Sequence, residues 1–475
     1  MRHDRSHTKV IATLGPATQK KEVLEQLFLE GIDVCRLNFS HGSHEDHLKN
    51  ILLIRELNEE LDAKVAILAD LQGPKLRIGE VENNGVILEA GSEFVLTSEK
   101  IIGTAEKAYM SYELLPRDVK VGETILIDDG KLKLEVISTN KQDKVTTKVI
   151  YGGPLSSRKG VNLPSTKISL PSLTEKDIKD AAFALKHDVD WIALSFVRHV
   201  TDIIDLKELI KKSKKDTRII AKIEKPEALE EIDEIIDMTD SIMVARGDLG
   251  VEVDFDRVPM IQKQIVEKCI SASKPVIIAT QMMESMITNF RPTRAEATDV
   301  ANAVLDGADT LMLSGETSVG KFPAGVIKSM QSIIDWTEDH GFKYFRDHPP
   351  IKGLPTYFPD SICYNAVLMA EQTGADAIIT FTHSGYTAFK ISSYRPKANI
   401  FAITTNESLL PMLSLVWGVR AYIGIDHENM IDYIDHSISF LKEKNLIKEG
   451  DVIVHVGSMP ANKRGKTNML KISYI

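Results

Sequence analysis

The sequence has few cysteines, no long apolar segment and no excess of positive charge, and each absence excludes a class of protein. Its three cysteines, Cys35, Cys269 and Cys363, are widely spaced and match no metal or disulfide pattern, which suits a reducing compartment. No segment approaches the roughly 20 apolar residues that cross a bilayer, and the first residues lack the apolar core of a secretion signal. The formal net charge of -10 argues against broad nucleic-acid binding. We therefore expect a cytoplasmic protein that binds neither membranes nor nucleic acids.

The composition is that of a globular protein with more than one domain. A hydrophobic content of 43% and a charged content of 27% are ordinary for such chains. A length of 475 residues predicts two or three domains.

Strand and helix patterns alternate through most of the first 341 residues. Short runs rich in β-branched residues predict eight strands, each followed by a helical pattern, at residues 9–13, 33–37, 64–69, 191–194, 219–223, 242–245, 276–279 and 310–313. Residues 1–73 and 171–341 together match the size of a (β/α)8 barrel, which typically has roughly 250 residues. This count favours a closed TIM barrel over an open doubly wound sheet.

Two further domains are expected. Residues 74–170 read as short alternating strands, and the turn Asp128-Asp129-Gly130 is typical of a hairpin. We interpret this stretch as an all-β domain inserted after the third barrel strand. A Pro- and Gly-rich linker follows the barrel, and residues 342–475 resume the alternation as a smaller α/β domain, with strands at 377–381, 400–404 and 452–456.

The predicted barrel strands end in polar residues, which is where barrel enzymes place their active sites. The strand-helix-strand stretch 218–250, with its helix at 226–238, delivers two carboxylates and a lysine to one rim. Such a set suits a divalent cation that holds a phosphate or carboxylate, although a rim of structural ion pairs is the alternative for this stretch alone. A full ring of polar strand ends favours an active site: Arg36, Asn38, Asp70, Lys222, Glu224, Asp248, Thr280 and Ser314. His44 and His47 lack the spacing of a zinc-protease motif, and a solvated helix face is the expected place for both.

Long strings of the sequence resemble the pyruvate kinase family, in the right order and over essentially the whole chain. They are Ala12–Pro16, Cys35–Gly42, Lys159–Pro164, Ala221–Glu224, Val244–Glu252, Ala279–Met286, Pro292–Glu296 and Asp306–Thr317. The resemblance implies a barrel, a β-rich lid after its third strand, and a C-terminal α/β domain. It also implies transfer of the phosphoryl group of phosphoenolpyruvate to ADP, giving pyruvate and ATP.

The resemblance further implies a role for individual residues. Glu224 and Asp248 would hold Mg²⁺ or Mn²⁺, and Lys222 and Arg36 would stabilise the phosphoryl group in transfer. The backbone at Gly247 and Asp248, with the Thr280 hydroxyl, would bind the substrate carboxylate, and Thr280 with a chain of water molecules is our hypothesis for the proton donor to the enolate. The nucleotide would be bound by Arg36, Asn38, His41, Arg77 and Lys159.

One departure from the commonest family pattern concerns potassium. Many members hold K⁺ near residues that correspond to Asn38, Ser40, Asp70 and the carbonyl of Leu71, with a glutamate where this chain has Lys75. A lysine ammonium supplies the positive charge that the bound ion otherwise provides. We therefore predict activity without added potassium.

The C-terminal domain contains a candidate effector loop. Thr382, Ser384, Gly385 and Thr387 resemble the hydroxyl-rich loop that binds phosphorylated effectors in regulated members. The alternative is a plain strand-to-helix turn capped by Ser384 or Thr387, and the sequence leaves both open. The basic loop at residues 459–468 permits a phosphorylated ligand. The family is generally tetrameric, so a homotetramer is expected.

Two rival functions remain at this stage. A metal-dependent barrel aldolase or lyase that acts on a pyruvate enolate would share Glu224 and Asp248, but it has no use for a lid with Arg77 and Lys159. A catalytically dead regulator that binds phosphometabolites would typically have lost Lys222 or one of its partners, and all are present.

Overall fold

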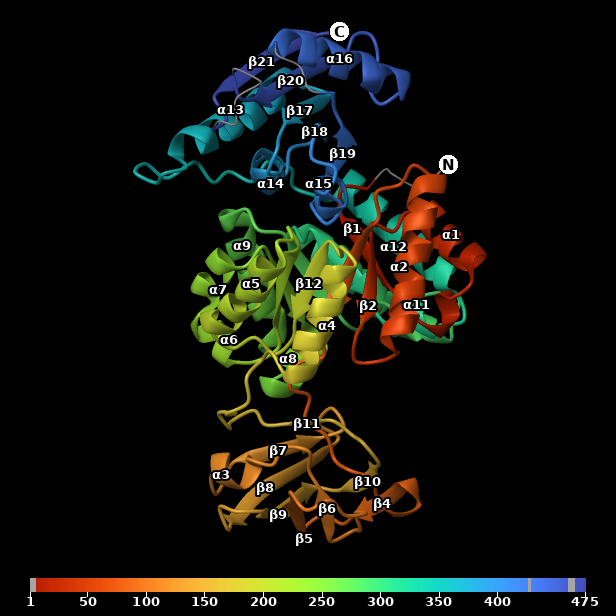
Figure 1. Cartoon of the computed structure of the whole chain (residues 1–475), viewed down its shortest axis with the longest axis vertical. Coiled ribbons are helices and arrows are strands. Elements are labelled where there is room, and N and C mark those ends of the chain that lie inside the picture. The colour runs from red at the N-terminus through yellow and green to blue at the C-terminus, as the bar shows by residue number, and fades with distance from the viewer. Residues whose placement is uncertain (1–5, 426–428, 460–465) are drawn as a thin grey trace.

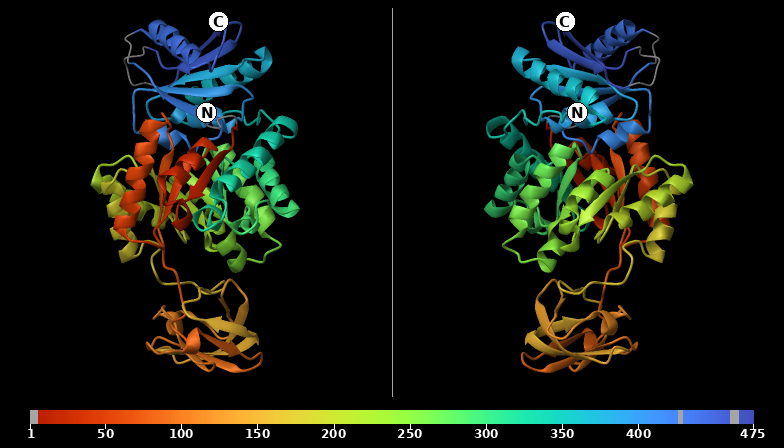
Figure 2. Two further views of the ribbon diagram at one scale, coloured as in Figure 1. Left: turned by 90° about the vertical axis from the view of Figure 1, so that its right-hand side faces the viewer. Right: turned by 90° about the vertical axis from the view of Figure 1, so that its left-hand side faces the viewer.

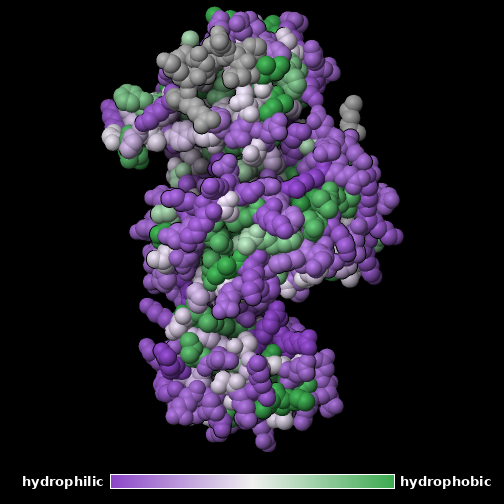
Figure 3. All heavy atoms as spheres, in the orientation of Figure 1, coloured by the Kyte–Doolittle hydropathy of each residue, from purple (hydrophilic) through white to green (hydrophobic). Residues whose placement is uncertain are grey.

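A computed structural model describes residues 6–425, 429–459 and 466–475 of the chain. The barrel lies in the middle of an elongated molecule, between the inserted β-rich residues at one end and the C-terminal domain at the other (Figures 1 and 2). Hydrophilic side chains cover most of the face seen in Figure 3. Within the described ranges, the helices include none with the length and apolar character needed to span a bilayer.

The expected (β/α)8 barrel is confirmed. Eight parallel strands close into a ring in the order β1-β16-β15-β14-β13-β12-β3-β2. Closure joins the first strand to the last, with Lys9 opposite Thr310. The strands are buried on both faces, which explains why they read as continuous apolar runs. Their bounds are β1 Lys9–Thr13, β2 Val34–Asn38, β3 Ala66–Asp70, β12 Trp191–Leu194, β13 Arg218–Ile223, β14 Ser241–Ala245, β15 Val276–Ala279 and β16 Thr310–Leu313.

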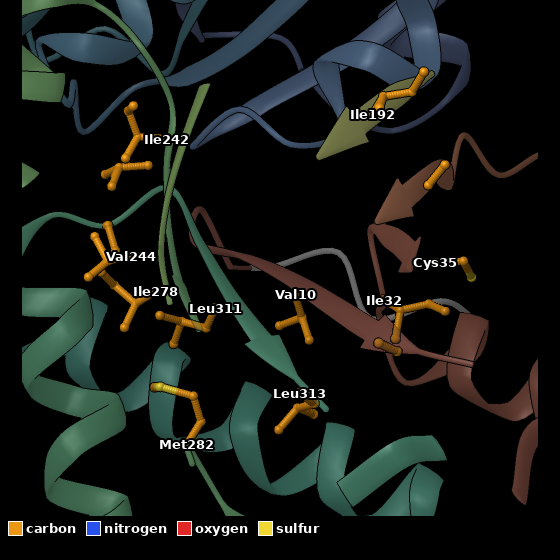
Figure 4. Packing of buried hydrophobic residues seen from close by; sticks show 14 of the residues in the cluster. Val10, Ile32, Cys35, Ile192, Ile242, Val244, Ile278, Met282, Leu311 and Leu313 are labelled. Atoms are coloured by element: carbon orange, nitrogen blue, oxygen red, sulfur yellow. The ribbon is translucent and has the colours of Figure 1, made fainter. Parts of the chain in front are cut away.

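Helices surround the barrel, and one buried apolar cluster joins them to the outer face of the strands. Val10, Ile192 and Ile278 belong to this cluster (Figure 4), whereas Ile11 and Leu68 lie in a second cluster that includes residues of the C-terminal domain. The helices are α1 Lys21–Leu29, α2 His44–Glu60, α4 Glu175–Lys186, α5 Val200–Ser213, α6 Glu227–Glu230, α7 Ile232–Met238, α8 Arg246–Glu252, α9 Val258–Ala272, α10 Arg294–Asp306, α11 Gly315–Ser318 and α12 Pro323–His340.

Local sequence explains where several of these helices begin. Ser43 and Thr293 each accept a hydrogen bond from the backbone three residues on, as the expected cap Thr174 does for α4. The prediction of a single helix at residues 226–238 is wrong. The stretch forms two helices, α6 and α7, because the backbone leaves the helical conformation at Glu231. The Glu231 carboxylate accepts a hydrogen bond from the Val200 amide at 3.1 Å.

The inserted residues form mostly antiparallel sheets with their own apolar core. The expected hairpin is present between β7 and β8, and all three turn residues have positive φ, at 53° for Asp128, 55° for Asp129 and 83° for Gly130. The elements are β4 Gly85–Leu88, β5 Glu93–Thr97, β6 Lys107–Tyr109, α3 Leu115–Asp118, β7 Thr124–Ile127, β8 Leu132–Thr139, β9 Lys144–Tyr151, β10 Gly153–Ser156 and β11 Val161–Asn162. We call residues 74–170 the lid.

The C-terminal domain is a five-stranded sheet in the order β19-β18-β17-β20-β21, in which only the β20–β21 pair is antiparallel. The three expected strands are present, and sequence reasoning missed β19 and β21. The elements are α13 Tyr357–Thr373, β17 Ala377–Phe381, α14 Tyr386–Ser393, β18 Asn399–Thr404, α15 Leu409–Leu413, β19 Val419–Ile423, α16 Met430–Glu443, β20 Val452–Gly457 and β21 Met469–Tyr474.

Buried polar contacts fix this domain against the barrel. The Arg395 guanidinium is 1% exposed and donates to an Asp309 carboxylate oxygen at 2.9 Å and to the Gly307 carbonyl at 2.8 Å. The Trp417 ring stacks on His7, with ring centroids 4.6 Å apart. Asp309 directly precedes β16, so the C-terminal domain contacts the barrel at the end opposite to the carboxyl ends of its strands.

Candidate active site

The carboxyl ends of the barrel strands point toward the lid (Figure 1), and the predicted site residues gather there. Asp70, at the end of β3, lies at the centre of the group and is 1% exposed. One of its oxygens is 2.6 Å from Arg36 Nε, and the other is 3.2 Å from Lys222 Nζ. Arg36 also donates to Thr13 Oγ1 at 2.9 Å. Burial alone raises the pKa of Asp70, but Lys222 and Arg36 outweigh it and hold that pKa below its usual range.

Lys222 has three polar partners in this buried setting. Besides Asp70, its ammonium lies 3.0 Å from Glu224 Oε1 and donates to Ser195 Oγ at 2.7 Å. Burial lowers the pKa of Lys222, but the carboxylates of Asp70 and Glu224 outweigh burial and raise it above its usual value. The side chain is therefore a fixed cation, held on both sides by carboxylates.

Glu224 and Asp248 form the expected pair of carboxylates. Glu224 Oε2 accepts a hydrogen bond from the Phe196 amide at 2.6 Å. Burial raises the pKa of Glu224 to about 7; Lys222 lowers it, and the nearby charge of Asp248 raises it. Two mutually repelling hard oxygen donors fit a divalent cation. Among the described residues, no group of three or more His, Cys, Asp or Glu is placed to hold a metal, so a cation here needs further oxygen ligands from substrate or water.

The start of α8 and the end of β15 form a second part of the site. The Gly247 amide donates to Thr280 Oγ1 at 2.7 Å, and a Cβ on Gly247 would lie 3.4 to 3.6 Å from the Thr280 side chain. Thr280 has a φ of 72°, a strained conformation for a β-branched residue. Arg246 supports it, because its guanidinium donates to the Thr280 carbonyl at 2.8 Å and to Asp299 Oδ1 at 2.7 Å. Arg246 therefore supports the Thr280 backbone; its ion-pair partner is Asp299, not Glu224 or Asp248 as a salt-bridge network among the rim residues would require.

Positive side chains of the lid base and the barrel surround His41. Burial lowers the pKa of His41, and the charges of Arg77, Lys75 and Arg36 lower it further. Lys159, which is also expected to bind nucleotide, forms an ion pair with Asp128 within the lid, at 2.9 Å.

The lid side chains are thus engaged with the lid itself. Arg77 donates to the carbonyl of Arg158 at 3.1 Å. Arg158 directly precedes Lys159, so this bond holds Arg77 near Lys159 within the lid. Among the described residues, no hydrogen bond or ion pair joins Arg77 or Lys159 of the lid to Arg36, Asn38 or His41 of the barrel, although the charge of Arg77 acts on His41.

The residues of the expected potassium site lie next to one another, and several of their polar groups already have hydrogen-bond or ion-pair partners. Asn38 Oδ1 accepts the Ser40 amide at 3.1 Å, Asn38 is paired with Asp70 in the barrel sheet, and the Leu71 carbonyl accepts the Ser195 hydroxyl at 2.7 Å. The Lys75 side chain is exposed nearby and lines a cavity between the barrel and the lid.

Sequence reasoning missed Ser195 and Thr13, which support the two cations. Ser195 directly follows β12, so the rule that picks polar residues at strand ends would have found it. The expectation of a solvated His47 is wrong. Its ring is 6% exposed and stacks on Phe39, with centroids 4.1 Å apart.

The candidate effector loop connects β17 to α14. The turn is capped by Gly385, with a φ of 85°, and not by Ser384 or Thr387; the Gly385 amide donates to Thr382 Oγ1 at 3.0 Å. Thr387 is buried, 3.1 Å from Thr467 Oγ1. Most of the basic loop 459–468 lies outside the described residues.

Comparison with known proteins shows to which family the chain belongs. The model of the pyruvate kinase barrel domain matches residues 5–327, and that of the pyruvate kinase alpha/beta domain matches residues 360–473. The chain belongs to the pyruvate kinase family. Pyruvate kinases of Bacillus licheniformis and Geobacillus stearothermophilus are 41% and 42% identical to it, over 98% of this chain and 80% of theirs.

A solved structure extends the likeness to the fold. A crystal structure of a pyruvate kinase from Cryptosporidium parvum matches with a TM-score of 0.92 and 37% identity, covering 99% of this chain and 96% of that one. Membership of the pyruvate kinase family confirms the expectation of a phosphotransferase.

Proposed function

We propose that this enzyme transfers the phosphoryl group of phosphoenolpyruvate to ADP, giving pyruvate and ATP. The observation that supports the proposal is the arrangement around Asp70, where Arg36 and Lys222 stand beside the carboxylates of Glu224 and Asp248. Phosphoryl transfer depends mostly on positioning and on stabilisation of negative charge, and this site supplies both fixed cations and cation ligands. An enolate aldolase or lyase would have no use for the lid's basic residues.

Each residue then has a task in the reaction. Arg36 binds the phosphoryl oxygens with its planar guanidinium. Lys222 stabilises the phosphoryl group and also the enolate oxygen from which the phosphoryl group departs. Glu224 and Asp248 would hold Mg²⁺ or Mn²⁺. When bound, this cation supplies Lewis-acid stabilisation of the substrate's oxygen atoms.

The other end of the substrate lies at α8. The backbone amides of Gly247 and Asp248, with the Thr280 hydroxyl, bind the carboxylate. The phosphorus–oxygen bond of phosphoenolpyruvate breaks as a β-phosphate oxygen of ADP bonds to the phosphorus, and the enolate left behind takes a proton at its methylene carbon. Thr280, through water, delivers that proton.

The nucleotide is bound between barrel and lid by Arg36, Asn38, His41, Arg77 and Lys159. Arg77 and Lys159 now contact lid partners, so they exchange these for phosphate oxygens when ADP binds. Closure of the lid excludes water, which otherwise competes with ADP as the phosphoryl acceptor.

The direct test is pyruvate formation from phosphoenolpyruvate, ADP and Mg²⁺, measured by coupling to lactate dehydrogenase. We expect turnover by the wild type and a fall of about 100-fold or more for Lys222→Met, since removal of one preorganised charge costs about that much. Absence of turnover by the folded wild type, with and without potassium, would refute the proposal.

We also propose that catalysis needs no potassium. The proposal is supported by the charge of Lys75, which acts on His41 next to the expected site, and by the ion pairs that already balance Asp70. Because the positive charge is covalently attached, a bound monovalent ion at Asn38, Ser40, Asp70 and Leu71 is dispensable.

Regulation and assembly complete the proposal. A phosphorylated small molecule would bind at Thr382, Ser384, Gly385 and Thr387, where the Ser384 carbonyl also accepts from Arg218 at 2.9 Å. A homotetramer is proposed because the pyruvate kinase family, to which the chain belongs, is generally tetrameric. Sedimentation of a 52.9 kDa species at micromolar concentration would contradict the tetramer.

A further inference from the structure

A buried polar contact joins the base of the lid to the barrel beside the active site. Glu252 Oε1 accepts from Lys225 Nζ at 2.6 Å and from Asn162 Nδ2 at 2.8 Å. Asn162 belongs to the lid strand β11, whereas Lys225 and Glu252 belong to the barrel. All three residues are buried, with Glu252 4% and Lys225 5% exposed. We call these three residues the lid-base contact.

The lid-base contact lies next to the proposed reacting groups along the chain. Lys225 directly follows Glu224, and Glu252 ends helix α8, whose first turn contains Asp248. Asn162 lies three residues after Lys159. The contact therefore connects the two carboxylates proposed to hold the divalent cation with the lysine proposed to reach the nucleotide.

Two features show that the contact is more than ordinary packing. A buried ion pair is a costly way to gain stability, so its presence at a domain junction favours a role in geometry. In addition, Glu252 Oε2 is buried and has no hydrogen-bond partner in the part of the chain that the structure describes. The carboxylate also lines the cavity between lid and barrel, together with Lys75, Asp129 and Asp248.

We propose that Glu252 is a positioning residue for the lid. By holding Asn162 and Lys225 on one oxygen, it fixes the direction in which β11 leaves the barrel and thus where Lys159 stands relative to Glu224 and Asp248. The inference rests on the proposed function, since the place of Lys159 matters only when the lid carries nucleotide. Its consequence is selective: the lid-base contact governs use of ADP and not binding of phosphoenolpyruvate to the barrel.

The test uses Asn162→Ala in the full-length protein. This change removes the lid's amide but leaves the Lys225–Glu252 ion pair intact, so no buried charge loses its partner. Asn140→Ala is the matched control, because Asn140 lies in a distal lid turn and bonds to nearby lid residues such as Asp143. We expect the KM for ADP to rise about tenfold in Asn162→Ala. ADP must then order the lid without one hydrogen bond to a charged group, and the loss of such a bond corresponds to about this factor. The Kd of phosphoenolpyruvate, measured calorimetrically with Mg²⁺ and no ADP, should stay within twofold of the wild type.

A second readout follows the lid without any reaction. The three native cysteines are buried, so spin labels can be placed at Tyr151→Cys on the lid and Leu52→Cys on α2, both at exposed positions. Double electron–electron resonance should give a broader distance distribution for Asn162→Ala than for the wild type and the Asn140→Ala control.

The outcomes separate the two proposals. An ADP KM within twofold of the wild type together with an unchanged distance distribution would overturn the role of Glu252. A Kd for phosphoenolpyruvate that weakens as much as the KM for ADP would also overturn it, because the contact would then support the barrel site itself. A wild type that forms no pyruvate would instead refute the proposed function, and the spin-label distances would still decide whether the lid-base contact positions the lid.

Discussion

Replacement of Asp70 by asparagine removes one charge from the centre of the site with almost no change in size. In the wild type the Asp70 carboxylate pairs with Arg36 at 2.6 Å and with Lys222 at 3.2 Å. An amide in its place still accepts one hydrogen bond, but it leaves two buried cations that repel each other. In this variant Arg36 keeps its hydrogen bond to Thr13, and Lys222 keeps its ion pair with Glu224 and its hydrogen bond to Ser195.

The expected magnitudes follow from this geometry. Loss of one partner of a buried ion pair destabilises a protein by about 3–5 kcal/mol, and the amide and the remaining partners favour the low end, about 3 kcal/mol. Displacement of the two cations by ~1 Å lowers kcat on the order of 100-fold. The pKa of Lys222 should also fall, because one of the two carboxylates that raise it is gone.

Asp33→Asn is the matched control for this experiment. Asp33 is also a buried aspartate with a lysine partner, 3.8 Å from Lys9 Nζ, and it accepts the Val10 amide at 2.9 Å. It precedes β2, at the opposite end of the barrel. We expect the control to lose stability in urea unfolding while its kcat stays near that of the wild type. A kcat for Asp70→Asn within threefold of the wild type, or an equal loss in Asp33→Asn, would refute this account of the site.

Three further predictions concern other parts of the molecule. The wild type should turn over equally in potassium and tetramethylammonium chloride at equal ionic strength, and Lys75→Glu should acquire a potassium requirement; strong activation of the wild type by potassium would contradict this. Arg395→Met should lower the free energy of unfolding by about 3 kcal/mol, because it leaves the buried Asp309 without its cation; an unchanged urea midpoint would argue against it. Glu338 is buried, and hydrogen bonds from His7 and Thr8 hold its pKa below the usual value. Its stabilisation is therefore present above about pH 4.5 and lost as the pH falls through the lowered pKa. The urea midpoints of the wild type and Glu338→Gln should converge in acid.

The barrel was predictable from sequence because its strands are buried on both faces and stand between helical patterns. The missed strands β19 and β21 are only partly buried, so their sequences lack a continuous apolar run. The break at Glu231 and the burial of His47 depend on contacts with distant or neighbouring elements, which a helical pattern does not encode.

The candidate site was predictable as a set of residues but not as an arrangement. Polar strand ends identified Arg36, Asp70 and Lys222, yet nothing in the sequence indicated that one carboxylate lies between both cations. The contact of Asn162 with Glu252 joins two domains and was not foreseen, because an asparagine in a short lid strand has no distinguishing pattern.

Closure of the barrel has a consequence for the order of synthesis. The first strand, β1, pairs with β2 on one side and with β16 on the other, and the Thr13 hydroxyl that supports Arg36 itself donates to the Leu313 carbonyl at 2.7 Å. As the chain leaves the ribosome, β1 therefore keeps one edge unpaired until residues beyond Leu313 have emerged. The earliest part of the chain therefore completes its pairing among the last.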